Sequence, residues 1–273
     1  MTMRFFDTHV HFGRGEDGTG SPDDAMVRAR DRGVLRMLAV GGDVQADAAA
    51  LAAAARWQAV AGVVLGRDRD QAGTAPAGKL VEDLEREIER EAANGRRVVG
   101  VGEIGLDYHY HPERAEAEKR LLVLQMELAA RRKLPVVMHS REAESDTVAI
   151  LGEFAGRRSH DGTAGVVHSF TGGPDLAVKI ADLGFCLGFS GILTFKNADL
   201  LRDAARVVPE DRLLVETDTP FLTPVPCRGQ PNEPAFVVHV ADRLAAVRQC
   251  SLEHIAECTW RNACRLFGLP ESG

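Results

Sequence analysis

Two histidines in the stretch Asp7-Thr8-His9-Val10-His11 are the first residues whose type and spacing suit chemistry. They end an apolar run over residues 3–10 that is typical of a strand. Successive side chains of a strand point to opposite faces, so His9 and His11 project from the same face. Two imidazoles on one face can bind a divalent ion through their ring nitrogens. The pair alone is a weak signal, because polar strand ends often contain histidine.

Four further metal-competent residues follow later strand-like segments. Glu103 follows 98–101, His139 follows 134–138, His168 follows 165–167, and Asp218 follows 213–215. The ordinary alternative for Glu103 and Asp218 is that each carboxylate caps a turn. Six such groups at strand ends favour one shared metal site over six separate explanations.

The elements that must position these residues alternate along the chain. Strands are expected at 3–10, 35–40, 59–65, 98–101, 134–138, 165–167, 185–189 and 213–215. Helices are expected at 23–32, 43–57, 80–94, 113–132, 142–155, 174–183, 197–208, 233–248 and 252–267. This alternation predicts an α/β fold, a (β/α)8 TIM barrel with C-terminal helices, formed as one domain over residues 1–273. The active site of such a barrel lies at the C-terminal ends of its strands, where all six residues would meet.

Composition excludes several classes of protein. Apolar residues make up 45% and charged residues 27% of the 273-residue chain, as in ordinary globular proteins. No apolar run approaches the ~18 residues of a membrane span. The first strand begins without a signal peptide, and the five cysteines lack C-x-x-C spacing. We therefore expect a cytoplasmic protein with reduced thiols, no membrane association and no obligate protein partner.

The net charge of −7 argues against binding along a DNA duplex, which requires a basic surface. It leaves open a nucleic-acid end that enters a pocket whose metal ions supply positive charge.

Two other groups have metal-like spacing. His109 and His111 lie in a loop before Pro112, where a substrate-loop role or no role is the simpler interpretation. His254 and Cys258 are four residues apart on a C-terminal helix, far from every strand end, and most resemble core or surface residues.

Several blocks of sequence, in order, now point to a known family. They are D-T-H-V-H at 7–11, G-E-I-G-L-D-Y-H at 102–109, L-P-V-V-M-H-S-R-E-A at 134–143, H-S-F-T-G at 168–172, S-G-I-L-T-F-K-N-A at 190–198, E-T-D-T-P-F-L-T-P at 216–224 and R-G-Q-P-N-E-P at 228–234. The sequence resembles the TatD family of metal-dependent deoxyribonucleases, within the amidohydrolase-like barrels. The resemblance implies that His9, His11, Glu103 and Asp218 hold one metal ion. It also implies that Glu103, His139 and His168 hold a second ion, with Glu103 bridging the two.

The chain departs from the family pattern at two places. The family often has Gly-x-His-Pro after the third strand, and the corresponding stretch here is expected to be Gly62-Val63-Val64-Leu65. Cys227 stands where the family commonly has histidine, most simply as a plain loop residue.

The resemblance implies a hydrolase of DNA phosphodiester bonds, a 3′–5′ exodeoxyribonuclease acting on single strands or 3′ ends. Two divalent ions can activate water and clamp a phosphate, with Asp218 as general base and Glu103 as bridge. Arg141, Arg228 and, less strongly, Lys196 are expected to bind the phosphate, while Asp107 and Ser140 orient ligands. The ions are magnesium, manganese or zinc. The alternatives are an ester or amide hydrolase, such as a D-aminoacyl-tRNA deacylase, and a catalytically idle metal-binding interaction protein.

Overall fold

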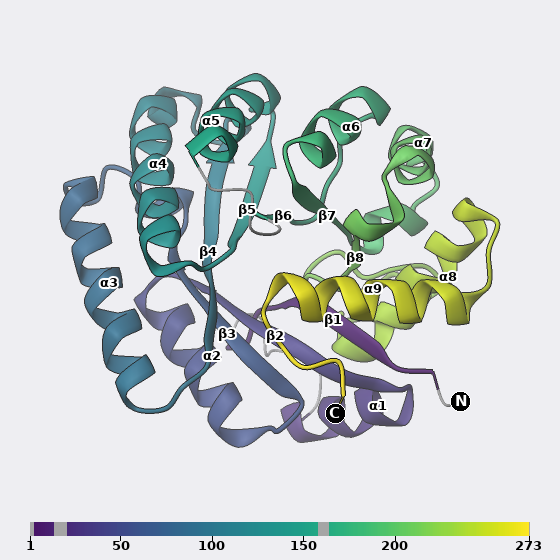
Figure 1. Ribbon diagram of the computed structural model, residues 1–273. Helices are drawn as coiled ribbons and strands as arrows, with labels where there is room; N and C mark the ends of the chain where they lie inside the picture. The colour runs from purple at the N-terminus through teal and green to yellow at the C-terminus, as the bar shows by residue number, and fades with distance from the viewer. Residues whose placement is uncertain (1–2, 14–20, 158–163, 273) are drawn as a thin grey trace.

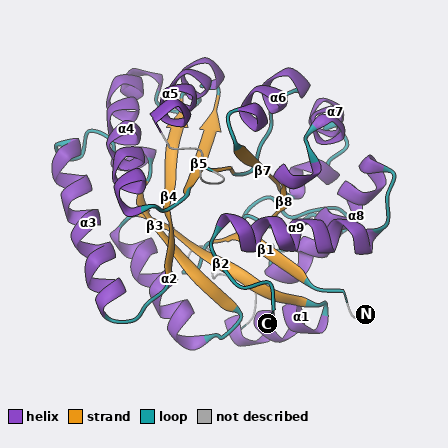
Figure 2. Cartoon of the chain, viewed as in Figure 1, coloured by secondary structure: helices purple, strands orange, loops and turns teal. Residues whose placement is uncertain are grey.

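Eight parallel strands follow one another around a sheet in chain order in the computed structural model, which describes residues 3–13, 21–157 and 164–272. The strands are β1 (Phe5–Val10), β2 (Val34–Gly42), β3 (Val60–Arg67), β4 (Val98–Asp107), β5 (Val136–Arg141), β6 (Gly165–Val167), β7 (Phe185–Phe189) and β8 (Leu213–Val215). Helices lie outside this ring (Figure 1; Figure 2). The predicted (β/α)8 barrel is confirmed.

The helices lie close to their expected positions. They are α1 (Pro22–Asp31), α2 (Val44–Arg56), α3 (Ala77–Ala93), α4 (Ala115–Arg132), α5 (Glu144–Arg157), α6 (Pro174–Asp182), α7 (Asp199–Val207), α8 (Val237–Arg248) and α9 (Leu252–Leu266). Three of these helices have a side-chain N-cap: Ser21 for α1, Asp43 for α2 and Ser251 for α9. Each capping side chain accepts a hydrogen bond from a backbone N–H of the first turn. Among the described residues, no helix is both long and apolar enough to cross a membrane.

The barrel closes where β8 meets β1. Val10 pairs with Thr219 in an isolated parallel bridge, and the His11 N–H donates to the Thr219 carbonyl at 2.9 Å. The Asp218 N–H donates to the His9 carbonyl at 3.0 Å. These contacts bring the two ends of the chain of strands together, so residues of the first and last strands share the barrel's C-terminal end.

Two apolar layers stabilise the barrel. Inward-facing residues such as Phe6, Leu38, Val64 and Val137 form the inner cluster, and the outward-facing residues pack beneath the helices. Trp260 of α9 belongs to the inner cluster and lies 5.8 Å from the Phe6 ring. Figure 1 shows α9 lying across the ring between β1 and β8. It closes the N-terminal end, which leaves the C-terminal end as the open one.

Three strands run further than the sequence indicates. β4 extends to Asp107 and β5 to Arg141, because Gly105 pairs with His139 and Asp107 with Arg141. Glu103 and His139 therefore lie within their strands and not after them, which corrects the expected boundaries. A Cβ at Gly105 would lie 2.0 Å from the His139 carbonyl oxygen. Only glycine allows this approach, and because glycine has a low strand propensity the sequence pattern places the end of β4 too early.

β3 also runs past its expected end. Gly62, Val63, Val64 and Leu65 lie inside the strand, as the expected strand 59–65 had them, so this stretch is not the one that corresponds to the family's Gly-x-His-Pro after the strand. The residues at the strand's C-terminal end are Gly66-Arg67-Asp68-Arg69.

Candidate metal centre

Six side chains, in or just after β1, β4, β5, β6 and β8, converge at the open end of the barrel. We call His9, His11, Glu103, His139, His168 and Asp218 the histidine–carboxylate cluster. All are buried except His139, which is partly exposed. Every member was expected from the sequence, and the structure brings all six together.

Four members surround one point near β1. The Nε2 atoms of His9 and His11 lie 3.1 Å apart, and they lie 3.6 and 3.4 Å from Glu103 Oε2. Asp218 Oδ1 lies 3.9 Å from the first of these nitrogens and 3.6 Å from the second. This is the set that the family resemblance assigns to one ion.

Three members surround a second point. Glu103 Oε1 lies 3.7 Å from His139 Nδ1 and 3.4 Å from His168 Nε2. The two ring nitrogens are 3.4 Å apart. The two oxygens of Glu103 thus face different groups, as a bridging carboxylate must.

The spacing of these atoms fits metal ions. Ligand atoms about 2.0–2.2 Å from a tetrahedral ion lie about 3.3–3.6 Å from one another. The distances within the two groups, 3.1–3.9 and 3.4–3.7 Å, lie around this value. Nitrogen and carboxylate oxygen together suit zinc or manganese, and the oxygens also suit magnesium. The residues therefore fit the divalent ions that the fold family implies.

Polar partners on the far side of each ring set which nitrogen faces the cluster. His11 Nδ1 lies 3.0 Å from the Val40 carbonyl oxygen, to which it can donate. His139 Nε2 lies 3.5 Å from Asp107 Oδ2. Such partners fix the tautomer and leave the other nitrogen unprotonated for a metal ion. Asp107 thus lies where an orienting residue should, whereas the Ser140 hydroxyl pairs with Thr147 of α5 at 2.8 Å.

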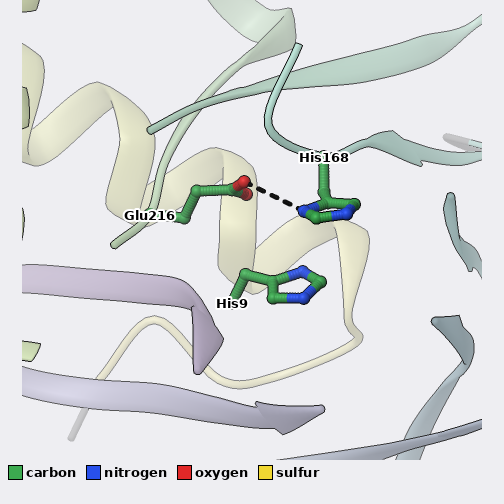
Figure 3. Close-up of side chains that lie close together, drawn as sticks. All are labelled: His9, His168 and Glu216. Atoms are coloured by element: carbon green, nitrogen blue, oxygen red, sulfur yellow. Dashed lines mark hydrogen bonds and ion pairs between the residues drawn. The ribbon is translucent and has the colours of Figure 1, made fainter. Parts of the chain in front are cut away.

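Glu216 supplies the same kind of partner to His168, and sequence reasoning gave it no role. Figure 3 shows the Glu216 carboxylate directed at His168, with His9 beneath. Glu216 Oε1 lies 3.3 Å from His168 Nδ1 and accepts the Ser169 N–H at 2.6 Å. These contacts direct His168 Nε2 toward Glu103. The available signal was its position directly after β8, two residues before Asp218 in the same segment.

His9, His168 and Glu216 also form a third group with metal-like spacing. It shares His9 with the first of the two groups described above and His168 with the second. Because Glu216 is already committed to Ser169 and His168 Nδ1, we interpret this group as support for the ligands.

Burial and mutual charge shift the pKa values of the cluster. Burial raises the pKa of Asp218 to about 6 and lowers that of His9 to about 3. Burial opposes the charged forms of Glu103 and His168, but their mutual attraction prevails. It holds the pKa of Glu103 well below and that of His168 well above their usual values. The metal-free cluster thus contains a carboxylate and an imidazolium whose proton an ion would replace.

The cluster opens into a cavity of about 540 Å³ at the C-terminal end of the barrel, which we call the mouth cavity. Tyr110 and Phe221 on its wall are 65% and 48% exposed, and the Arg141 guanidinium lies 5.0 Å from the Tyr110 ring. The lining residues are Arg69, Asp107, Tyr110, His139, Ser140, Arg141, Ser169, Thr171, Ile192, Asp218, Phe221 and Leu222.

Of the three residues expected to bind phosphate, only Arg141 lies in the described lining of this cavity. Arg228 is exposed, donates to the Thr223 carbonyl at 3.0 Å and lies 4.3 Å from the Phe195 ring. Lys196 is exposed beyond the short helix Gly191–Thr194. Arg69, which sequence reasoning did not select, lies in the lining and contacts Glu103 at 2.7 Å.

The remaining candidates lie outside the cluster. His109 pairs with Glu142 at 2.6 Å, His111 with Glu113 at 3.2 Å, and His254 with Glu210 at 3.0 Å. Cys258 is buried against the Glu210 carbonyl. Cys227 is a half-buried loop residue, and burial raises the pKa of its thiol.

Comparison with known proteins agrees with this geometry. The sequence model of the family described as TatD related DNase matches residues 6–268. The chain is 44% identical over 192 residues to the "Uncharacterized metal-dependent hydrolase YcfH" of Escherichia coli, covering 70% of this chain and 69% of the relative. It is 33% identical to YabD of Bacillus subtilis, another metal-dependent hydrolase by name, over 96% of this chain and 98% of the relative.

A solved structure is similar over nearly the full length. The crystal structure of YjjV, a TatD homologue from Escherichia coli, superposes with a TM-score of 0.87 at 32% identity. The match covers 99% of this chain and 100% of that chain. The chain therefore belongs to the TatD family of metal-dependent hydrolases, as the sequence blocks predicted.

Proposed function

We propose that this hydrolase cleaves phosphodiester bonds of DNA from the 3′ end of a single strand. One observation carries the proposal: the histidine–carboxylate cluster opens into a cavity lined by Arg141 and by the exposed rings of Tyr110 and Phe221. Arginines bind phosphate oxygens through paired donors, and aromatic rings stack on unpaired bases. The family description supports DNA, and the expected polarity rests on the family resemblance.

The proposal places two divalent ions at the cluster. His9, His11, Glu103 and Asp218 would hold one, and Glu103, His139 and His168 the other. When bound, such ions supply Lewis acidity that lowers the pKa of water and offsets charge on the phosphate.

The chain's own residues supply the remaining steps. Asp218, which lies beside the cluster and lines the mouth cavity, accepts the proton of the water that attacks phosphorus. The bond from phosphorus to the leaving oxygen breaks as the new phosphorus–oxygen bond forms, and a proton from solvent completes the leaving hydroxyl. Arg141 binds a phosphate oxygen, while Tyr110 and Phe221 stack on the terminal bases. A single strand fits this arrangement because its bases are free to stack.

The test is a degradation assay on single-stranded DNA labelled at either end, with magnesium, manganese and zinc in turn. We expect a 5′-labelled strand to shorten one nucleotide at a time, because cleavage from the 3′ end leaves that label on the shrinking strand. A 3′-labelled strand should release its label at once as a small product. Chelation should abolish both results.

Two outcomes would contradict the proposal. An enzyme with bound metal that leaves DNA intact but deacylates D-aminoacyl-tRNA would be an ester hydrolase on the same centre. A protein that binds metal and is inert toward both substrates would be an interaction protein. The control variant is Glu103→Gln. It removes the carboxylate charge that the two groups of ligand residues share, and it should eliminate any activity that depends on the cluster.

A further inference from the structure

Arg69 stands at the end of β3, at the entrance to the cluster, and none of the functions described above uses it. It begins the short helix Arg69–Gln71, which is capped by Asp68 through the Asp70 N–H at 3.1 Å. A Cβ at Gly66 would lie 2.5 Å from the Gly102 carbonyl, so this glycine lets the end of β3 approach β4. The approach brings Arg69 within reach of carboxylates on the neighbouring strand.

The guanidinium of Arg69 contacts two of these carboxylates. Its Nη1 lies 2.7 Å from Glu103 Oε1, and its Nε lies 3.6 Å from Asp107 Oδ2. The side chain is 24% exposed and lines the mouth cavity. Glu103 Oε1 is also the oxygen that faces His139 and His168. In the metal-free protein, therefore, Arg69 balances the charge of the oxygen assigned to the second ion.

A guanidinium and a divalent ion repel one another and compete for the same oxygen. An ion held by Glu103, His139 and His168 would have the higher charge and two histidine nitrogens in addition, so it would take the oxygen. Arg69 would then keep Asp107 as its partner and present its terminal nitrogens to the cavity. A guanidinium has five donors in a planar fork that matches two oxygens of a phosphate.

We propose that Arg69 is a substrate-binding residue. It binds the substrate's phosphate once a metal ion has replaced it at Glu103 Oε1. The inference rests on the proposed function in that it takes a phosphate as the ligand. Arg141, at the end of β5, lies beside the Tyr110 ring, whereas Arg69 lies in the short helix after β3, so the two arginines approach the cavity from different elements. Arg69 contacts the cluster directly and is placed to bind the phosphate nearest the ions.

The test is calorimetric titration of inorganic phosphate into the manganese-saturated protein. We expect Arg69→Gln to weaken phosphate binding about ten- to hundredfold, since a hydrogen bond to a charged group contributes about that much. Arg69→Lys keeps the charge but lacks the planar fork of donors, so its phosphate affinity should lie between those of the unaltered protein and Arg69→Gln. Arg86→Gln is the matched control. Arg86 is exposed on α3, so this substitution removes the same charge at a site away from the cavity.

A manganese titration of each variant comes first. Because Arg69 competes with metal, Arg69→Gln should bind manganese at least as tightly as the unaltered protein. Weaker manganese binding would overturn the proposal by showing that Arg69 supports the ligands. Unchanged phosphate affinity in Arg69→Gln would overturn it as well.

These results are separable from the proposed function. If the unaltered enzyme fails to cleave DNA, the phosphate titration still decides whether Arg69 binds phosphate. If it cleaves DNA while Arg69→Gln binds phosphate normally, the DNA proposal stands and the role of Arg69 is refuted.

Discussion

Replacing Glu216 by glutamine tests whether the cluster is oriented by residues behind it. Glu216 is 1% exposed, and its Oε1 lies 3.3 Å from His168 Nδ1. Glutamine preserves the shape and can still accept the Ser169 N–H, but it removes the negative charge. His168 Nδ1 then faces a neutral amide oxygen in place of the carboxylate that directs its Nε2 toward Glu103, whereas the fold keeps its packing.

The magnitude follows from the charge that the acceptor loses. A buried hydrogen bond to a charged group contributes about 1.5–3 kcal/mol, and about 1.4 kcal/mol corresponds to a tenfold change in affinity. We therefore expect metal affinity to fall about 10- to 100-fold, the range usual for partners of metal-binding histidines. The loss should fall on the ion held by Glu103, His139 and His168. The other ion should be affected less, because its ligands do not include His168.

Calorimetric metal titration with thermal unfolding as a control measures this effect. At limiting metal, the variant should bind one ion tightly, whereas we expect the unaltered protein to bind two. Glu91→Gln is a matched control, since Glu91 is similarly buried but lies on α3 beside Arg90. A folded Glu216→Gln variant with both affinities unchanged would refute the orienting role.

Three further predictions follow from the same geometry. Asp218→Asn should stay folded and lose about 10²–10⁴-fold in nuclease rate at saturating metal, as expected for a general base; retention of most activity would remove Asp218 from the mechanism. Arg228→Ala should raise KM for DNA more than it lowers kcat, with a neutral ester unaffected, if this exposed side chain contacts a distant phosphate; equal losses on both substrates would indicate support of the fold instead. Metal binding at pH 7 should release at least one proton, because the raised pKa of His168 leaves a proton for the ion to displace. Affinity should then rise with pH, and titrations in two buffers of different ionisation enthalpy would show the release or its absence.

The sequence was sufficient to predict the barrel and the meeting of six ligand-type residues. Chain order is ring order in a (β/α)8 barrel, so a polar residue at each strand's C-terminal end must face the same opening. His9 and Asp218, which are far apart in the chain, meet because β1 and β8 adjoin.

The lengths of β3, β4 and β5 could not be predicted in the same way. Glycines such as Gly102 and Gly105 weaken the strand signal, and only the close approach of neighbouring strands explains them. Arg69 escaped notice for a related reason, since it stands beyond a strand whose end was placed too early.

Side-chain direction in loops was also beyond sequence reasoning. Arg228 lies against Phe195 in a segment without periodicity, so nothing in the pattern shows which way its guanidinium turns. Glu216 resembles any carboxylate near a strand end until its contact with His168 is known.

A two-ion centre bridged by Glu103 should be visible in a crystal structure with manganese, recorded at a wavelength where manganese scatters anomalously. We predict two anomalous peaks about 3.5–4 Å apart, one on each side of the Glu103 carboxylate. One should lie among His9, His11 and Asp218, and the other between His139 and His168. A single peak, or peaks only at His109 and His111 or at His254 and Cys258, would contradict the account.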